Sequence, residues 1–422
     1  MMNEIRLRDI HTRHAMIRFF DGEAAARVEE LDERRSRRPW VKTYLLEILD
    51  GHETQTSEGL QKLFGNYGVR FSPIDDHLYF VTNETLGEIG FAERLSTRII
   101  ALYSALDSNQ LKSWVHRLVH SSPDIDHVWL SGVTFGVLWK LVTKLSSSSR
   151  FTRLVFTHDS IFDVDAGDAA AEVEDEQGDS TTPQVEEDDV EPIVERRATS
   201  FRLVDRVGVI QNKLEILQSN YAPLHAISQL RFPSAVGRGG HDFYDNGRVT
   251  NRSESFRDHR SHLLFVVRIY QQLLTSTEDQ AWYSITESVG MPGQFRKIVG
   301  APVLVRFQEA LNQAVFDEWV NATFGRKRNK FRFWGHPIRL GPTKVHVYGV
   351  DRHLFRPLFL ELTAKGCTAI IPNGTCGNTI HRLVTNIQRY LDPGAQAYIG
   401  DKPYRQIVEE SAEGVPYELD GE

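Results

Sequence analysis

Cysteine is scarce in this sequence of 422 residues, since only Cys367 and Cys376 occur. Two thiols do not make a disulfide framework, and they are too few for a structural zinc site built on cysteine. This scarcity is typical of a reducing compartment, so we expect a cytoplasmic protein.

Long hydrophobic runs are absent as well. Apolar stretches such as residues 263–267 are far shorter than the roughly 20 residues of a membrane-spanning helix. The first residues carry no apolar core of a signal peptide. We therefore expect no membrane partner.

The short motifs of several familiar enzymes are also absent. The chain contains no G-x-S-x-G, no H-E-x-x-H, no G-x-x-x-x-G-K-[ST] and no H-x-K phosphodiesterase signature. Enzymes without these motifs exist, so the sequence leaves catalysis open, and any cofactor stays unknown.

Positive charge is missing from residues 163–195, which carry 14 acidic side chains, no Lys, no Arg and no aromatic residue. Like-charge repulsion without apolar burial keeps such a segment unfolded. We predict an acidic, disordered linker over residues 163–198.

This linker separates regions of different charge. Residues 1–162 carry 20 basic and 21 acidic side chains, residues 196–405 carry 29 and 16, and residues 406–422 carry 0 and 6. An excess of 13 positive charges on one half is a footprint of nucleic-acid binding. A basic surface that is simply solvated explains the same count.

Hydrophobic periodicity predicts a mixed α/β fold. We expect an N-terminal α/β domain (1–162), the linker, a mainly helical region (199–325), a basic α/β region (326–405) and an acidic tail (406–422). The expected helices are 23–37, 41–49, 91–106, 111–120, 135–145, 201–217, 263–274, 302–324, 353–364 and 379–391. The expected strands are 77–82, 128–130, 153–157, 330–334, 344–350, 368–371 and 396–399, with a loop over 232–257. The order of strand, helix and strand in residues 128–157 predicts a parallel sheet.

The strongest local signal is residues 326–344, where seven basic side chains alternate with aromatic ones and no acid occurs. In a strand over residues 330–334, alternation puts the two phenylalanines on one face and Lys330, Arg332 and Trp334 on the other. Cations there would neutralise phosphates while the indole stacks a base, worth about 1–3 kcal/mol. The competing interpretation puts the aromatic rings in the core and the charges in a solvated loop. The predicted nucleic-acid contacts are Arg326, Lys327, Arg328, Lys330, Arg332 and Trp334.

A second motif lies between a predicted buried strand and a predicted helix. Backbone N–H groups at a helix start, with the helix dipole behind them, favour an anion such as phosphate. A simple helix cap is the alternative, because the lysine of a P-loop is missing. The predicted phosphate contacts are Gly374, Thr375, Gly377, Asn378 and Thr379.

Histidine and aspartate gather in residues 225–262. Imidazoles and carboxylates together can hold a divalent metal for phosphoester hydrolysis. The order of His225, the pair at 241–242 and Asp258 resembles that of the HD phosphohydrolases, which implies such a metal site. Polar loop residues paired with nearby arginines are the competing interpretation. The candidate catalytic residues are His241, Asp242, Asp258 and His259.

Three functions remain as hypotheses. The first is binding of a nucleic acid, DNA or RNA, through its phosphate backbone. The second is a metal-dependent phosphoesterase or nuclease, and the third is docking of an acidic protein partner on the basic surface. We also hypothesise that the tethered acidic segment screens that surface, and the alternative is a linker that acts only as a solubilising spacer.

Overall fold

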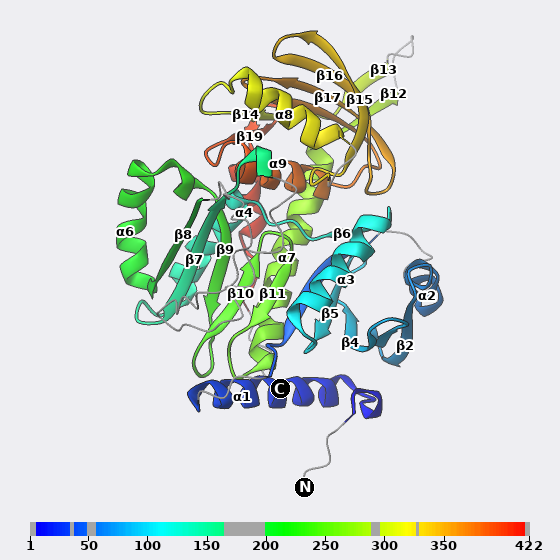
Figure 1. The fold of residues 1–422 in the computed structure, drawn as a ribbon, viewed down its shortest axis with the longest axis vertical. Helices are drawn as coiled ribbons and strands as arrows, with labels where there is room; N and C mark the ends of the chain where they lie inside the picture. Colours follow the sequence, from blue (N-terminus) through cyan, green and yellow to red (C-terminus); the bar gives the residue numbers. More distant parts are fainter. Residues whose placement is uncertain are drawn as a thin grey trace, which may run out of the picture.

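The computed structural model describes residues 6–33, 38–48, 56–163, 199–287, 296–325 and 329–417, which form two β-sheets with helices packed on and between them (Figure 1). The predicted mixed α/β class is confirmed. Within these ranges, no helix combines the length and the apolar character needed to cross a membrane. Residues 164–198, nearly the whole predicted linker, lie outside the described residues.

The first sheet has the strand order β2-β3-β4-β5-β1-β11-β10-β9-β7-β8, and β6 also pairs with β1. Its described pairs are all antiparallel. Strands from both sides of the acidic segment share this sheet, so the predicted boundary at residue 162 does not separate two sheets. The strands are β1 Lys42–Ile48, β2 Val69–Asp75, β3 Leu78–Asn83, β4 Gly87–Arg94, β5 Ile99–Ser104, β6 Ile125–His127, β7 Phe151–His158, β8 Thr199–Arg206, β9 Ile227–Pro233, β10 Gly240–Tyr244 and β11 Arg248–Asn251.

The second sheet has the order β15-β16-β17-β18-β14-β19-β20, and β12 joins β18 in parallel while pairing with β13. The meander β15 to β18 is antiparallel, with one register shift in the β15–β16 pair between Arg339 and Gly341. The strands are β12 Trp282–Glu287, β13 Arg296–Val299, β14 Val303–Arg306, β15 Phe333–Gly341, β16 Lys344–Asp351, β17 Arg356–Thr363, β18 Gly366–Pro372, β19 Gln396–Ile399 and β20 Lys402–Pro403.

The helices cover the sheets and join them. The longest, α7, starts at the Ser255 cap, whose hydroxyl accepts the Asp258 N–H, and it runs from the first sheet to the second (Figure 1). The α-helices are α1 Arg13–Asp32, α2 Ser57–Gly65, α3 Ser108–Ser121, α4 Gly132–Leu145, α6 Val207–Asn220, α7 Phe256–Ala281, α8 Gln313–Phe324, α9 Asn378–Tyr390 and α10 Tyr404–Ala412. Short 3-10 helices cover Leu7–Asp9, Ile161–Asp163 and Ala222–His225.

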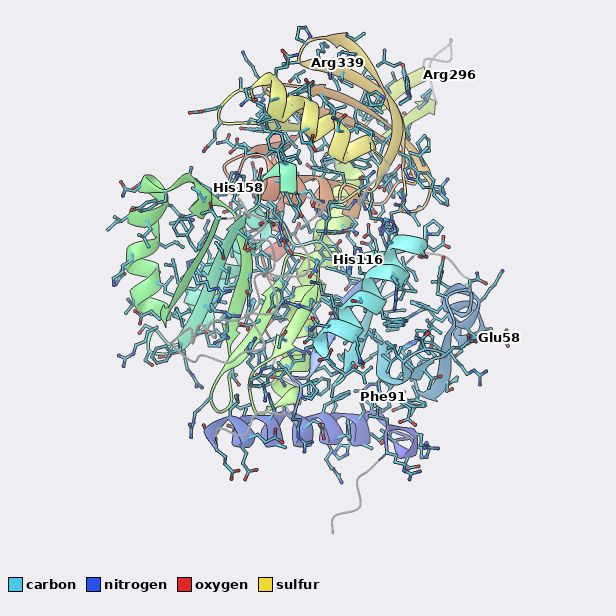
Figure 2. All side chains as sticks on the ribbon, viewed as in Figure 1. Glu58, Phe91, His116, His158, Arg296 and Arg339 are labelled. Carbon is cyan, nitrogen blue, oxygen red and sulfur yellow. The ribbon has the colours of Figure 1, made fainter. Side chains whose placement is uncertain are left out.

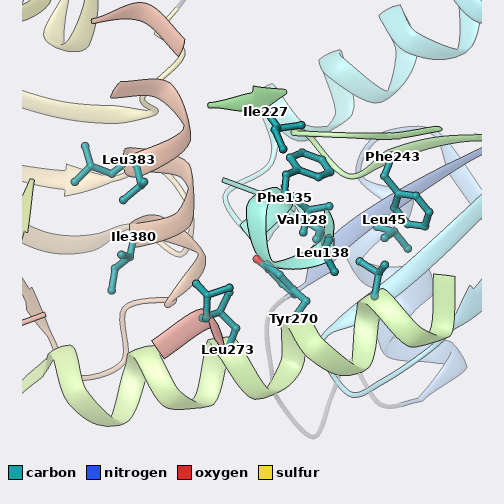
Figure 3. Packing of buried hydrophobic residues seen from close by; sticks show 14 of the residues in the cluster. Leu45, Val128, Phe135, Leu138, Ile227, Phe243, Tyr270, Leu273, Ile380 and Leu383 are labelled. Atoms are coloured by element: carbon teal, nitrogen blue, oxygen red, sulfur yellow. The ribbon is translucent and has the colours of Figure 1, made fainter. Parts of the chain in front are cut away.

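One hydrophobic core is continuous between the two sheets. Figure 3 shows Tyr270 and Leu273 of α7 between Leu138 of α4 and the pair Ile380 and Leu383 of α9. A second, smaller cluster lies between the first sheet and the helices α2 and α3. Because α7 and α9 contribute to the same core as the strands of both sheets, the two sheets pack as one body.

Several predicted helices are strands. The stretch 41–49 is β1, whose residues are all buried, and an apolar run without alternation does not distinguish a buried strand from a helix. The stretch 91–106 is the hairpin β4–β5. The hydroxyl of Ser96 accepts the N–H groups of Arg98 and Ile99 and so closes its turn. The predicted parallel unit is also wrong, because β6 and β7 are not neighbours and each pairs antiparallel.

The predicted loop over residues 232–257 contains strands β10 and β11. Its glycines serve the hairpin turns, since Gly237, Gly239 and Gly247 all have positive φ. The predicted helix 353–364 is β17, with Leu358 and Leu360 in the core at a spacing of two. The predicted mainly helical region 199–325 therefore holds seven strands in its described part.

Other predicted elements are confirmed. The helices 111–120, 135–145, 263–274 and 379–391 lie in α3, α4, α7 and α9, apart from one residue at the end of the last. The strands 153–157, 344–350, 368–371 and 396–399 lie in β7, β16, β18 and β19. Residues 406–412 of the predicted acidic tail lie in α10, which buries Ile407 and Val408 in the core.

Candidate functional site

The outer face of strands β15–β18 is rich in exposed aromatic side chains. Alternation along β16 puts Val345 and Val347 into the core and leaves Tyr348 on the other face, 75% exposed. The ring centroids of Tyr348 and Phe359 are 5.2 Å apart. The register of the strands places His336, Tyr348, Phe359 and Ile370 in one row.

A stacked pair forms one corner of this face. The Trp334 ring, 50% exposed, lies 5.6 Å from that of Phe355 at an interplanar angle of 25°. The guanidinium of Arg352 lies over the indole, 4.9 Å from its centroid, and donates a 2.8 Å hydrogen bond to the His120 carbonyl. Phe355 has a φ of 47°, a left-handed conformation that residues other than glycine rarely adopt. The corner is thus held in place from two sides.

The hairpin β12–β13 extends the same face. Tyr283 is opposite Pro372 of β18, and Ile285 is opposite Ile298. Both isoleucines are about two-thirds exposed, at 66% and 67%. Figure 2 shows Arg296 of β13 and Arg339 of β15 at the same end of the molecule. We call this surface the aromatic face, made of Ile285, Ile298, Trp334, His336, Ile338, Tyr348, Phe355, Phe359 and Ile370.

The polar groups of the aromatic face favour an anionic ligand over a cationic one. Glu361, in the row beside Tyr348, pairs with Lys344 at 2.9 Å and with His346 at 2.6 Å. Hydrogen bonds from Lys344 and His346 lower the pKa of this carboxyl group. Its charge is therefore neutralised locally.

The structure separates the predicted nucleic-acid contacts. Trp334 is exposed on the aromatic face, and Lys330 is half-buried before the start of β15. Arg326, Lys327 and Arg328 lie outside the described residues. The competing interpretation, in which the aromatic rings of this segment lie in the core, holds for Phe331 and Phe333, which are both buried. It does not hold for Trp334, whose indole is exposed.

The prediction that Arg332 faces solvent is wrong. Its φ of 57° breaks the strand alternation, because β15 starts only at Phe333. The buried guanidinium donates to the carbonyls of Ser122 and Ile125 and to Asp126 at 2.9 Å. It joins the sheets and is not available to a phosphate.

Part of the positive charge of residues 196–405 is used inside the protein in the same way. These arginines pair with acids of the N-terminal segment as well as of their own. The pairs are Arg260–Glu93, Arg332–Asp126, Arg382–Asp126, Arg382–Asp351, Arg389–Asp159, Arg389–Asp245, Arg231–Asp242 and Arg252–Asp242. The charge count of the sequence therefore overstates the positive charge of the surface.

The predicted phosphate site at the start of α9 already holds an anion from the chain itself. The carboxylate of Glu278 accepts the Gly377 N–H at 2.8 Å. The hydroxyl of Thr379 donates to Asp351, and the amide oxygen of Asn378 accepts from Tyr270 at 2.5 Å. The remaining two residues of the motif form the preceding turn, in which Thr375 is buried and Gly374 has a φ of 86°. The favourable helix start is thus satisfied by protein groups.

A buried ionic centre adjoins this helix start. The Arg98 guanidinium donates to Glu47 at 2.7 Å and to Glu278 at 2.8 Å, and its Nη2 lies 2.9 Å from the Cys376 sulfur. Burial raises the pKa of Glu47 although Arg98 opposes that change, and burial raises the pKa of the Cys376 thiol. A thiol held in its protonated form is a poor nucleophile, so this centre is built for stability.

The histidine–aspartate cluster converges only in part. His241 on β10 contacts Asp258 of α7 at 2.9 Å, and its ring lies near those of His259 and His262. Asp242 points to the opposite face of β10, because neighbouring strand residues alternate. There Arg153, Arg231 and Arg252 surround it and hold its pKa well below the ordinary value, against the effect of burial.

This separation corrects the candidate catalytic set. The pair at positions 241 and 242 cannot share a ligand, and His225 is exposed on a 3-10 helix, with its Nδ1 2.7 Å from the Ala222 carbonyl oxygen. The pairing of Asp242 with arginines agrees with the competing interpretation, in which polar loop residues pair with nearby arginines. However, His241 and Asp242 lie in the strand β10 and not in a loop. The predicted resemblance to HD phosphohydrolases is not matched by this geometry.

Sequence reasoning missed most of the aromatic face. Tyr348 lies in the correctly predicted strand 344–350 but is not singled out there. Phe355 and Phe359 are missed because residues 353–364 are predicted to form a helix. The signal that identifies Phe359 is the spacing of two in residues 356–363, where buried leucines alternate with other side chains.

Comparisons with known proteins place the chain in a family but give no ligand. A family model described as MJECL33-like protein matches residues 4–406. A relative from Methanocaldococcus jannaschii, described as the uncharacterized protein MJECL33, is 25% identical over 151 residues, which are 36% of this chain. The matched part spans 34% of that relative's length. No solved structure matches the chain.

Proposed function

We propose that this chain, which belongs to the MJECL33-like protein family, binds single-stranded nucleic acid on the aromatic face. The observation that carries the proposal is the exposure of Tyr348 and Trp334 on one sheet face, each with a second aromatic ring beside it. Unpaired bases stack on such rings, and each stacked base is worth about 1–3 kcal/mol.

The face suits single strands better than duplexes. Bases of a duplex are already stacked on one another, so exposed rings on a sheet gain contacts only with unstacked bases. The described part of the face is formed by strands and turns, with no helix placed to enter a major groove. Lys344 lies on the same face of β16 as Tyr348, where phosphates of a stacked strand would pass.

The test is binding of a fluorescein-labelled oligonucleotide of about 20 nucleotides, measured by anisotropy, to the full chain and to Tyr348→Ala and Trp334→Ala. Loss of one stacking contact of about 1–3 kcal/mol raises Kd roughly 5- to 150-fold. Tyr221→Ala is the matched control, because this tyrosine is 51% exposed on the surface of the other sheet, near Phe201. The control should bind as the wild type does.

The salt dependence adds an independent reading. Lys344→Ala should lower the slope of log K against log salt by about 0.7 for a single strand, because one phosphate contact is lost. Binding that is unchanged by both aromatic substitutions, or that is equally weakened by Tyr221→Ala, contradicts the proposal.

A protein partner is the second candidate for the same face. Ile285, Ile298 and Ile338 are exposed and aliphatic, and contiguous apolar surface is typical of protein interfaces. Ile298→Lys distinguishes the candidates. It should abolish docking of a protein on the hairpin, whereas it leaves oligonucleotide stacking on Tyr348 intact or strengthens it through the added charge.

The phosphoesterase hypothesis has less support from the geometry. His241 and Asp258 are buried, and Asp242 lies on the other face of the strand among arginines. Hydrolysis needs a substrate to reach the metal-bound water, and burial of these side chains opposes that access.

A further inference from the structure

We infer that His241, Asp258 and His262 form a site for one divalent transition-metal ion of the zinc class. His241 lies on β10, and the other two lie one turn apart in α7. One ligand atom of each residue lies within 4.8 Å of the others. Two imidazoles and one carboxylate are a donor set that suits zinc, cobalt or nickel rather than magnesium or calcium.

The spacing of the ligand atoms is close to that of a zinc site. His241 Nε2 is 2.9 Å from Asp258 Oδ2, and His262 Nδ1 is 3.4 Å from Asp258 Oδ1. Bonds of about 2.0–2.2 Å in a tetrahedral arrangement put neighbouring ligand atoms roughly 3.3–3.6 Å apart. Small side-chain adjustments are therefore enough to surround an ion.

The aspartate is oriented for this role. Its Oδ2 accepts hydrogen bonds from the Ser234 hydroxyl at 2.6 Å and from the Ala235 N–H at 3.1 Å. Its other oxygen, Oδ1, is buried and accepts no hydrogen bond from the described residues. A buried carboxylate oxygen without a donor is unfavourable, and a bound cation supplies the missing partner.

Both histidines have an outer partner for the second ring nitrogen. The Nε2 of His262 is 2.8 Å from the Tyr417 hydroxyl, and the Nδ1 of His241 is 3.4 Å from that of His259. His259 in turn contacts the Thr43 hydroxyl at 2.8 Å. Such outer contacts fix the tautomer and the orientation of metal-bound imidazoles.

Metal binding exchanges one hydrogen bond of each histidine for the ion, since the Nε2 of His241 gives up its hydrogen bond to Asp258. Without metal, the Nδ1–H of His262 donates to the carbonyl of Asp258, one turn earlier, at 2.8 Å. When Nδ1 binds the ion, the proton is carried by Nε2, which then donates to the Tyr417 hydroxyl. Tyr417, which lies five residues after the end of α10, is thereby connected to the site. The ion therefore joins β10, α7 and the segment around Tyr417.

A second group of possible ligands is already filled by a cation. Glu47, His353 and Cys376 also converge, but the Arg98 guanidinium contacts both Glu47 and Cys376. A metal ion there would have to displace a buried arginine from two carboxylates. The described residues around His241 contain no arginine in contact with Asp258, so the first cluster is the metal site.

The test uses the full chain, freed of metal with a chelator and titrated with Co²⁺. The expected result is visible d–d absorption that saturates at about one equivalent and is reversed by Zn²⁺. Asp258→Asn should abolish it, and Tyr417→Phe should weaken Co²⁺ binding about 10- to 100-fold. Cys376→Ser is the matched control from the other cluster and should bind as the wild type does.

Three results would overturn the inference. They are absence of Co²⁺ absorption in chelator-treated wild type whose circular dichroism is native, absorption that persists in Asp258→Asn, and a thiolate charge-transfer band that disappears in Cys376→Ser. If Asp258→Asn does not fold, the Co²⁺ stoichiometry of the wild type and the Co²⁺ affinity of Tyr417→Phe still test the inference.

Discussion

Replacing Asp126 by asparagine should destabilise the protein strongly, because its carboxylate links the two sheets. The side chain is fully buried on β6 and accepts from Arg332 at 2.9 Å, from Arg382 of α9, and from the Trp129 indole at 3.2 Å. Asparagine keeps one acceptor oxygen but turns an NH₂ group toward a guanidinium. Removing one partner of a buried ion pair costs about 3–5 kcal/mol.

An exposed pair of the same chemistry is the control. Arg339 donates to Asp317 at 2.6 Å, but the two side chains are 45% and 38% exposed. Asp317→Asn should change the free energy of unfolding by less than about 1 kcal/mol. Denaturant unfolding at pH 7, followed by circular dichroism and tryptophan fluorescence, measures both variants. A loss below about 1 kcal/mol in Asp126→Asn would refute the reasoning.

The pH dependence of the stability of wild type and Asp126→Asn provides a second check. Burial alone would raise the pKa of Asp126, but Arg332 and Arg382 hold it well below the ordinary value. Its contribution to stability is therefore present above the unfolded pKa of about 3.9 and is lost as the pH falls toward the folded pKa. The difference between wild type and Asp126→Asn should be constant from pH 7 to 5 and should shrink below about pH 4.

Three further predictions concern single positions. Gly90→Ala should destabilise the first sheet by at least about 1–3 kcal/mol in denaturant unfolding, because φ is +146° and a Cβ would lie 2.0 Å from the Tyr103 carbonyl oxygen. Burial lowers the pKa of His381 to about 3, so the unfolded state binds the proton first, and stability should fall as the pH is lowered from about 6.5 by up to about 1.4 kcal/mol per unit. His381→Leu should lose less stability than wild type between pH 7 and 5; equal losses would contradict the assignment. The thiols of Cys367 and Cys376 are buried with raised pKa, so mass spectrometry should find both unmodified after iodoacetamide treatment of the native chain and both alkylated after unfolding.

Periodicity predicted those elements that expose one face to solvent. The helix α3 buries Leu111, Val115 and Leu118 on one side, and a spacing of three and four shows this in the sequence. The strand β1 buries every residue, so no alternation marks it. Its neighbours in the sheet are β5 and β11, of which β11 comes from beyond the acidic segment, a pairing that no local pattern contains.

The candidate sites could likewise be predicted only where a local pattern marks the residue. Trp334 could be predicted as an exposed ring from a strand pattern, but its partner Phe355 lies in a left-handed turn that the sequence does not indicate. The convergence of His241 with Asp258 depends on the packing of β10 against α7, and the separation of Asp242 depends on β10 being a strand. Charge counting failed for Arg332 because its acidic partner lies 206 residues away.

Photo-crosslinking tests the central proposal most directly, because it reports which residues touch the bases. An oligonucleotide that contains 4-thiouridine is irradiated with the full chain, and crosslinked peptides are identified by mass spectrometry. Our account predicts crosslinks in the peptides of β15–β17, at Trp334, Tyr348 and the nearby rings, which decrease in Tyr348→Ala. Crosslinks confined to other surfaces, such as α6 around Tyr221, would contradict it.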